Sequence, residues 1–389
     1  MYSKKNVIEN KEKQTILTHK ILLPLVNFLL KHPKYTLTGW GVLLMLCIGG
    51  ITLIKTSVNM ADYFKGDNPT RVAEEVMQKK FGGSLPIFVV FEGDMQSPEV
   101  LQKMIETEHF MKEDPNIDIT QSVADLIEQM NDAMREGEKI PDDKAKIEQL
   151  WFLLEGQDVM PQLVNNDLTK GVIQSKFASV DTKNIEAFTK KMNRFIEENQ
   201  NEYCEIELTG MPSVYDKLNS SLLNSQRNSL LIAIGLVILI VSAILRSASK
   251  GVFAAIPVVA TIIVLLGIMG ITGIPLDIAT VLVGSIALGI GIDYSIHIIT
   301  GFNNHLLENG DAEKSIESVI LLSGKAIIIN VVSVLAGFLV LLFSQIVPLQ
   351  NFGLLIGVSM IGSGFSALSL LPAILILANR KRKITANNH

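Results

Sequence analysis

The chain has 389 residues, of which 48% are hydrophobic and 19% are charged, and its formal net charge is −5. This composition is too apolar for an ordinary soluble enzyme and indicates a membrane protein that carries a soluble part. The two cysteines, Cys47 in an apolar run and Cys204 in a polar region, exclude a disulfide framework. Residues 56–228 hold 31 acidic and 18 basic residues, and the remainder holds 8 acidic and 16 basic residues. The membrane part is therefore the basic part.

A lysine-rich segment opens the chain, with seven lysines in its first 34 residues. Residues 14–30 within it are apolar, but Pro24 interrupts them and a basic stretch follows. This run is too short to join the first membrane span, and no small-residue cleavage site follows it. Residues 1–34 therefore predict a cytoplasmic N-terminus with an interfacial helix rather than a signal peptide.

Six stretches are long and apolar enough to cross a membrane, which takes about 20 mostly apolar residues. They are Tyr35–Ile54, Ser229–Leu245, Gly251–Ile271, Ile278–Phe302, Ala326–Ser344 and Phe352–Ala378. The chain is thus expected to have a first span at 35–54, a large loop at 55–228, a five-span bundle at 229–378 and a basic tail at 379–389. The predicted fold class is a multi-pass α-helical membrane protein with a separate domain in the loop.

The distribution of lysine and arginine predicts the orientation of these spans, because cytoplasmic flanks are rich in both. Basic residues lie in the N-terminal segment, in the second and fourth connections and after the last span. The short connections Thr272–Asp277 and Gln345–Gln350 contain none. We therefore expect a protein of the plasma (inner) membrane with both termini cytoplasmic and residues 55–228 external.

The loop itself alternates strand-like and helix-like segments. Three strands are expected at Pro86–Asp94, Val172–Val180 and Tyr203–Gly210, and two helices at Pro98–Lys112 and Lys183–Asn199. This alternation is typical of an α+β sandwich of the split βαβ type. Asp125–Leu154 is charged with a helical pattern, and Met211–Asn228 is expected to be a helix that runs directly into the second span.

The interiors of the six spans hold one acidic residue, Asp293, and one titratable base, His297. At about 100° per residue, one arc of the fourth span carries Ser285, Gly289, Asp293, His297 and Thr300. Small residues on such a stripe allow close approach of helices, and its polar residues need partners or water.

The fifth span offers Asn330, Ser333 and Gly337 on one face, with the two polar residues near the depth of Asp293. They are candidate hydrogen-bond partners. Gly289 and Gly291 do not form a phosphate-binding loop, because no strand precedes them and they lie in a membrane helix. Helix packing explains them, as it does Gly337.

Asp293 has two interpretations. As a structural anchor it would hold helices together, although a neutral Asn or Ser would do so at lower cost. As a proton carrier it would bind and release a proton as water access alternates, since removal from water favours the neutral carboxyl. The second interpretation is favoured. His297 is either a relay partner or an interfacial histidine. Tyr294 either takes part in the relay or only packs against its neighbours.

Several segments resemble the MMPL-like and hopanoid-exporter branch of the resistance-nodulation-division (RND) transporters, which is related to sterol-sensing domain proteins. They are "IPLDIATVLVGSIALGIGIDYSIHIITGF" (274–302), "FGGSLPIFVVFEGD" (81–94), "TGMPSVYDKLNSSLLNSQRNSLLIAI" (209–234), "RSASKG" (246–251), "FGLLIGVSM" (352–360) and "LSLLPAIL" (368–375). The resemblance covers the chain from the N-terminal helix onward. It implies an external porter-like domain and a proton-relay site at Asp293 and Tyr294.

The chain departs from the fused members of that family, which contain two such halves and twelve spans. It resembles the second half alone. The paired aspartates of the drug-efflux branch are absent, and Gly301-Phe-Asn-Asn304 replaces the usual Arg-Tyr-Arg-Glu after the fourth span. We therefore expect the half to pair, either with a second copy as a homodimer or with a separately encoded first half; the alternative is that it is a fragment of a fused chain.

The leading functional hypothesis is a proton-driven exporter of lipids or other hydrophobic molecules. It is not expected to be an enzyme, to bind metal or nucleic acid, or to need a cofactor other than the proton gradient. The alternatives are a non-transporting lipid-sensing or sterol-sensing-like scaffold and a SecF-like secretion accessory. Retention of Asp293 favours transport, because a sensor has no evident need for a carboxylate in the membrane.

Overall fold

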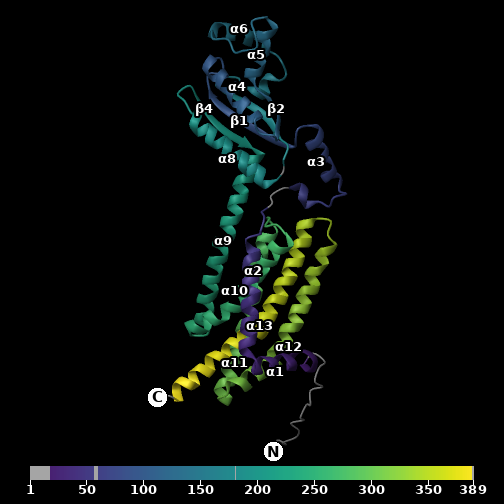
Figure 1. The fold of residues 1–389 in the computed structure, drawn as a ribbon, viewed down its shortest axis with the longest axis vertical. Coiled ribbons are helices and arrows are strands. Elements are labelled where there is room, and N and C mark those ends of the chain that lie inside the picture. The colour runs from purple at the N-terminus through teal and green to yellow at the C-terminus, as the bar shows by residue number, and fades with distance from the viewer. Residues whose placement is uncertain (1–17, 57–59, 180, 388–389) are drawn as a thin grey trace, which may run out of the picture. The chain divides into compact units, whose positions relative to one another are not determined.

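The computed structural model describes residues 18–56, 60–179 and 181–387. The chain divides into two compact units: a helical unit of Met1–Thr56 and Leu222–His389, and a sheet unit of Ser57–Ser221. Six of the described helices are long and apolar enough to cross a membrane, and they belong to the helical unit or enter it. The protein is therefore a multi-pass membrane protein (Figure 1).

The helical unit begins with a π-helical turn, Thr18–Leu22, and a short helix. Its helices are α1 (Leu23–Lys31), α2 (Pro33–Ile51), α9 (Met211–Ile244, shared with the sheet unit), α10 (Ala248–Thr272), α11 (Thr280–Asn309), α12 (Ala312–Leu339) and α13 (Val347–Asn387). A 3-10 turn, Val340–Phe343, continues α12. Pro24 stands in the first turn of α1, where a missing N–H costs nothing.

Glycines allow a close helix contact between α2 and α10. A Cβ added at Gly50 would lie 2.5 Å from the carbonyl oxygen of Gly267, so the two backbones touch. Small residues permit such approach in membranes, where helix association depends on packing. Elsewhere, Val26 and Leu29 of α1 are buried in the apolar cluster built mainly by α11, α12 and α13. Helix α1 therefore packs on the bundle.

The sheet unit contains a four-stranded antiparallel sheet with the order β2-β3-β1-β4. Its strands are β1 (Leu85–Gly93), β2 (Ile117–Gln121), β3 (Lys170–Phe177) and β4 (Cys204–Gly210). Its further helices are a 3-10 turn, Met60–Tyr63, then α3 (Pro69–Lys80), α4 (Pro98–Lys112), α5 (Val123–Ala133), α6 (Lys144–Leu154), α7 (Met160–Leu163) and α8 (Thr182–Asn199).

One face of the sheet carries the core of this unit. Alternate residues of β1, namely Ile87, Val89 and Phe91, are fully buried, as the period of two in a strand requires. Helices α4 and α8 supply further buried side chains, and Phe177 of β3 meets Phe188 of α8 with ring centroids 4.9 Å apart.

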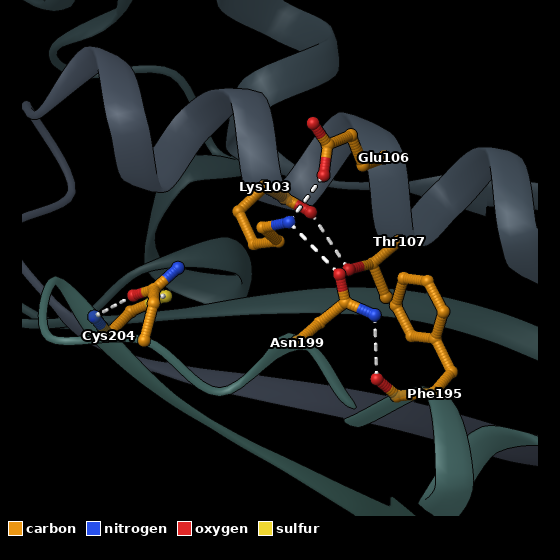
Figure 2. Close-up of polar contacts among 7 residues, drawn as sticks. Lys103, Glu106, Thr107, Phe195, Asn199 and Cys204 are labelled. Carbon is orange, nitrogen blue, oxygen red and sulfur yellow. Dashed lines mark hydrogen bonds and ion pairs between the residues drawn. The ribbon is translucent and has the colours of Figure 1, made fainter. Parts of the chain in front are cut away.

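Helices α4 and α8 are also joined directly (Figure 2). The ammonium of Lys103 pairs with Glu106 on its own helix and donates to the side-chain oxygen of Asn199, 3.2 Å away at the end of α8. The Asn199 amide in turn donates to the carbonyl oxygen of Phe195, whose ring stacks on Phe110 of α4. The polar and aromatic contacts together fix the end of α8 on α4.

Most of the expected elements are present, with ends shifted by a few residues. Helix α4 has the expected bounds, and α9 runs without a break from the sheet unit into the second span. Strand β2 and helix α3 were not expected. The region expected to be helical at 125–154 forms two helices, α5 and α6, separated by a ten-residue connection. Residues 14–17 of the expected N-terminal helix lie outside the described residues.

Candidate functional site

The polar stripe of α11 lies on the surface of the single chain. Ser285, Gly289, Asp293, His297 and Thr300 are all exposed, and 61% of the Asp293 side chain is accessible. The helical period that predicted this arc therefore matches the observed face of α11. An accessible carboxylate in the interior of a membrane span calls for a partner or for water, because hydrocarbon solvates it poorly.

One ionisable neighbour of Asp293 is one helical turn away. The Nε2 atom of His297 lies 3.6 Å from the Asp293 carboxylate, an i,i+4 pair on the exposed face of α11. A histidine at this spacing can accept a proton from the carboxyl group or return one to it. The pair therefore provides two titratable groups within reach of each other.

Tyr294 points in a different direction from Asp293 and is only 2% exposed. Its hydroxyl donates a hydrogen bond of 3.2 Å to the side-chain oxygen of Asn330 on α12. Asn330, a candidate partner of Asp293 from the sequence, thus bonds to the Tyr294 hydroxyl among the described residues, and its contribution to the site stays a prediction. Tyr294 both packs in the core and takes part in the polar contact.

These groups line one shallow cavity of about 110 Å³ between α11 and α12. Its lining residues are Asp293, Tyr294, His297, Ser323, Ala326, Ile327 and Asn330. The three predicted relay residues and Asn330 are therefore brought together. Ser323 and Ala326 were missed, although they precede Asn330 by seven and four residues, which is the spacing of one helix face.

The other predicted positions lie away from the lining of this cavity. Ser285 and Ser333 are exposed, and Gly289 and Gly337 have nothing within 4 Å of an added Cβ. Gly291 differs, since a Cβ there would lie 2.7 Å from the Ser363 hydroxyl on α13. Within the described chain, only Gly291 of these three glycines has a packing contact that requires glycine.

A second acidic residue, near the start of α11, shows what a structural carboxylate looks like in this protein. Asp277 is 2% exposed and accepts hydrogen bonds from the Ala279 and Thr280 amides and the Thr280 hydroxyl. These contacts satisfy the first amides of the helix, which is a capping role. Asp293 makes no such backbone contacts among the described residues, so local structure does not account for it.

The profile of the MMPL family matches residues 65–389, which is most of the chain. The chain belongs to the MMPL family. This agrees with the resemblance found in its motifs, and it places the cavity of α11 and α12 in a family of membrane transport proteins.

Relatives of this chain fall into two groups by the share of their own length that matches it. A membrane protein of Methanocaldococcus jannaschii is 24% identical over 353 residues, covering 87% of this chain and 89% of that protein. The sulfolipid-1 exporter of Mycobacterium tuberculosis is 26% identical over 118 residues, or 30% of this chain and 11% of the exporter. The apo-petrobactin exporter of Bacillus anthracis is 32% identical over 92 residues, or 24% of this chain and 12% of that protein. The match to each exporter thus covers about a tenth of that protein.

Proposed function

We propose that this MMPL protein exports lipids or other hydrophobic molecules, driven by the proton gradient, and works as a dimer of half-transporters. The observation that carries the proposal is the placement of Asp293 in a membrane span, beside His297 and next to the Tyr294–Asn330 pair. The names of both exporters support export, and the name of the sulfolipid-1 exporter supports a lipid substrate.

In the proposed mechanism Asp293 carries the proton. A carboxyl group in a poorly solvated site favours its neutral form, and access of water from one side or the other lets it load and unload. His297 relays the proton along the exposed stripe. Tyr294 positions the site, because its hydrogen bond to Asn330 ties α11 to α12 next to the carboxylate.

The exposed stripe of α11 supports the proposed pairing. A carboxylate, a histidine and two hydroxyls facing lipid would each cost free energy, and a partner subunit removes that cost. Gly289 and Gly337, open in the single chain, would then allow the close approach that glycine permits. A homodimer would place the same patch on both subunits about a two-fold axis. The other possible partner is a separately encoded first half.

The two units have assigned roles in this proposal. The sheet unit is the external porter-like domain. Its elements run β1-α4-β2, then α5, α6 and α7, then β3-α8-β4, and these two βαβ halves with the strand order β2-β3-β1-β4 support the split βαβ type. Helix α9 is continuous over 34 residues, so it is the element expected to carry movement from the span to the porter domain. The lysine and arginine distribution supports cytoplasmic termini in the plasma (inner) membrane.

Reconstitution tests the proposal against a non-transporting lipid-sensing scaffold. Purified protein in liposomes with a trapped pH-sensitive dye is given an inward proton gradient. We expect proton flux above that of empty liposomes, together with movement of a fluorescent phospholipid between leaflets, and loss of both in Asp293→Asn. Wild-type protein that binds lipid without moving protons would support the scaffold instead.

A further inference from the structure

Helix α3 (Pro69–Lys80) differs from the other α-helices that lie wholly in the described part of the sheet unit, because none of its residues is buried. Helices α4 to α8 each bury between two and six residues. Figure 1 shows α3 to one side of the sheet. A helix of twelve residues is marginal in water by itself, and most helical stability in proteins comes from packing. The described residues do not supply that packing on the outer face of α3.

The face of α3 that turns toward its own unit is mainly polar. The Arg71 guanidinium donates a 3.3 Å hydrogen bond to the carbonyl oxygen of Phe64, in the turn before the helix. The Glu74 carboxylate accepts a hydrogen bond from the Ser84 hydroxyl, just before β1. These contacts hold α3 to the chain on either side of it. They leave its aliphatic residues to the other face.

The exposed face of α3 carries those aliphatic side chains. Val72 is 49% exposed and Val76 is 41% exposed. They are four residues apart and therefore lie on one face of the helix, with Pro69 and Ala73 exposed beside them. Phe81, the residue that ends the helix, is 58% exposed. This is the reverse of an ordinary surface helix, which turns its apolar stripe toward the core.

Two lysines border the exposed aliphatic face at the C-terminal end of α3. Lys79 and Lys80 are both exposed, and Lys79 pairs over 3.7 Å with Glu75, whose side chain is 57% exposed. This basic end stands out because residues 56–228 are acidic as a whole. A helix with aliphatic groups on one face and lysines at its border suits a bilayer surface, where the ammonium groups reach the lipid phosphates.

The path of the chain keeps α3 near the lipid. Helix α2, the first of the six apolar helices, ends at Ile51. The Lys55 carbonyl then accepts a 2.8 Å hydrogen bond from the Leu276 amide, and Thr56 forms a β-bridge with Leu276, in the connection before α11. Residue 56 is thus fixed at the end of the helical unit, thirteen residues before α3 begins. A chain of that length spans at most about 45 Å, so α3 stays within reach of the membrane surface.

We propose that the exposed face of α3 lies on the surface of the lipid bilayer, with Val72 and Val76 against the acyl chains and Lys79 and Lys80 at the lipid phosphates. The partner is a membrane surface that bears anionic headgroups, and this contact is separate from the six spans. Because α2 tethers α3 to the same bilayer, docking is intramolecular, and contacts too weak for a free peptide suffice.

Docking of α3 has a consequence for the sheet. Strand β1 begins at Leu85, five residues after α3 ends at Lys80, and the hydrogen bond between Glu74 and Ser84 joins the helix to this connection. A helix held on the bilayer therefore restrains the start of β1 near the lipid surface. The sheet unit then has a second restraint at the membrane besides the continuous helix α9.

Spin labels on the full chain in lipid nanodiscs test the proposal. Val76→Cys carries the nitroxide, and the two native cysteines stay in place because both are buried. Oxygen concentrates among acyl chains and a nickel chelate in water, so power saturation reports which phase the label contacts. Gln149→Cys, at an exposed position of α6, is the control. In nanodiscs of phosphatidylcholine with phosphatidylglycerol, we expect an oxygen-to-nickel accessibility ratio at Val76→Cys several times that of the control.

A charge reversal in the labelled protein tests the lysines. Lys79→Glu/Lys80→Glu should lower the ratio at Val76→Cys in nanodiscs that contain phosphatidylglycerol, and less so in phosphatidylcholine alone. An unchanged ratio would overturn the role given to the lysines. Equal ratios at Val76→Cys and Gln149→Cys would overturn the proposal, as would spin–spin broadening between labels, which would show a second copy covering the face. Neither result bears on transport by Asp293, because the measurement needs no proton flux and a nanodisc exposes both sides of the bilayer.

Discussion

The hydroxyl of Tyr294 donates a 3.2 Å hydrogen bond to the side-chain oxygen of Asn330, and this contact joins α11 to α12 beside the exposed Asp293 carboxylate. In the proposed mechanism, this contact separates the roles of two adjacent residues of one helix. Asp293 faces outward on the stripe, where a proton can reach it, and Tyr294 faces inward, where it fixes the helix that carries Asp293.

Asp293→Asn is expected to abolish proton-coupled transport and to leave folding intact. The substitution is nearly isosteric, and its site is 61% exposed, so no buried contact is lost. Proton flux and lipid movement in liposomes would fall to the level of protein-free controls. Glu308→Gln, at the end of the same helix and 69% exposed, is the control and should transport normally. Wild-type transport by Asp293→Asn would make the structural-anchor interpretation the better one.

Tyr294→Phe is expected to impair transport less than Asp293→Asn, and His297→Ala less again. Loss of the phenol hydroxyl leaves Asn330 without its partner at a cost of about 1 kcal/mol in stability. The readouts are the transport rate and the thermal midpoint for each variant and for the Tyr294→Phe/Asn330→Ala double variant. If the hydrogen bond between Tyr294 and Asn330 contributes to these readouts, the effects of the two single substitutions will not add in the double variant. Simple addition would count against a joint role.

Gly289→Leu is expected to weaken the dimer without destabilising the subunit, since a Cβ added there has no atom within 4 Å in the single chain. Gly291→Ala should destabilise the subunit without weakening the dimer. Its Cβ would lie 2.7 Å from the Ser363 hydroxyl, and this overpacking of α11 against α13 should cost about 1 to 3 kcal/mol of stability. Native mass spectrometry and thermal unfolding in nanodiscs measure the two effects. A Gly289→Leu protein with unchanged dimer content would place the interface elsewhere.

Single cysteines are expected to show that the sheet unit is external. Gln129 of α5 and Ser249 of α10 are both exposed, whereas the two native cysteines are buried. Gln129→Cys should react with an impermeant maleimide on intact cells, and Ser249→Cys only after permeabilisation. The opposite pattern would invert the proposed topology.

The sheet unit should lose stability as pH rises from about 4.5 to about 7, in the range between the ordinary pKa of Glu108 and the value to which burial raises it. The folded state binds more protons than the unfolded state across this range, so the stabilisation is complete below it and lost above it. At about 1.4 kcal/mol per unit of pKa, the upper limit is about 3 kcal/mol. The free energy of unfolding of the wild-type protein and of Glu108→Gln, measured at pH 5 and pH 8, gives this loss. An equal change with pH in both proteins would contradict the prediction.

Local sequence determined the features that depend on one segment at a time. Six spans follow from runs of about 20 apolar residues, and the polar stripe of α11 follows from the 3.6-residue period. Helix α4 could be bounded because Pro98 stands at its first position and the apolar residues after it keep a helical period. The short strand β2 gives no such signal, because five residues are too few to establish an alternation of apolar and polar side chains.

Tertiary structure alone decided which side chains meet. The register between α11 and α12 is set by packing along their whole length, and it places Asn330 against Tyr294 while Ser333 remains exposed. Glu108 looks in sequence like a surface residue of a polar helix. It is buried where α4 packs against β2 and α5, and the Thr120 hydroxyl of β2 donates a hydrogen bond to its carboxylate. Such contacts depend on residues distant in the chain, and no periodicity within one segment reports them.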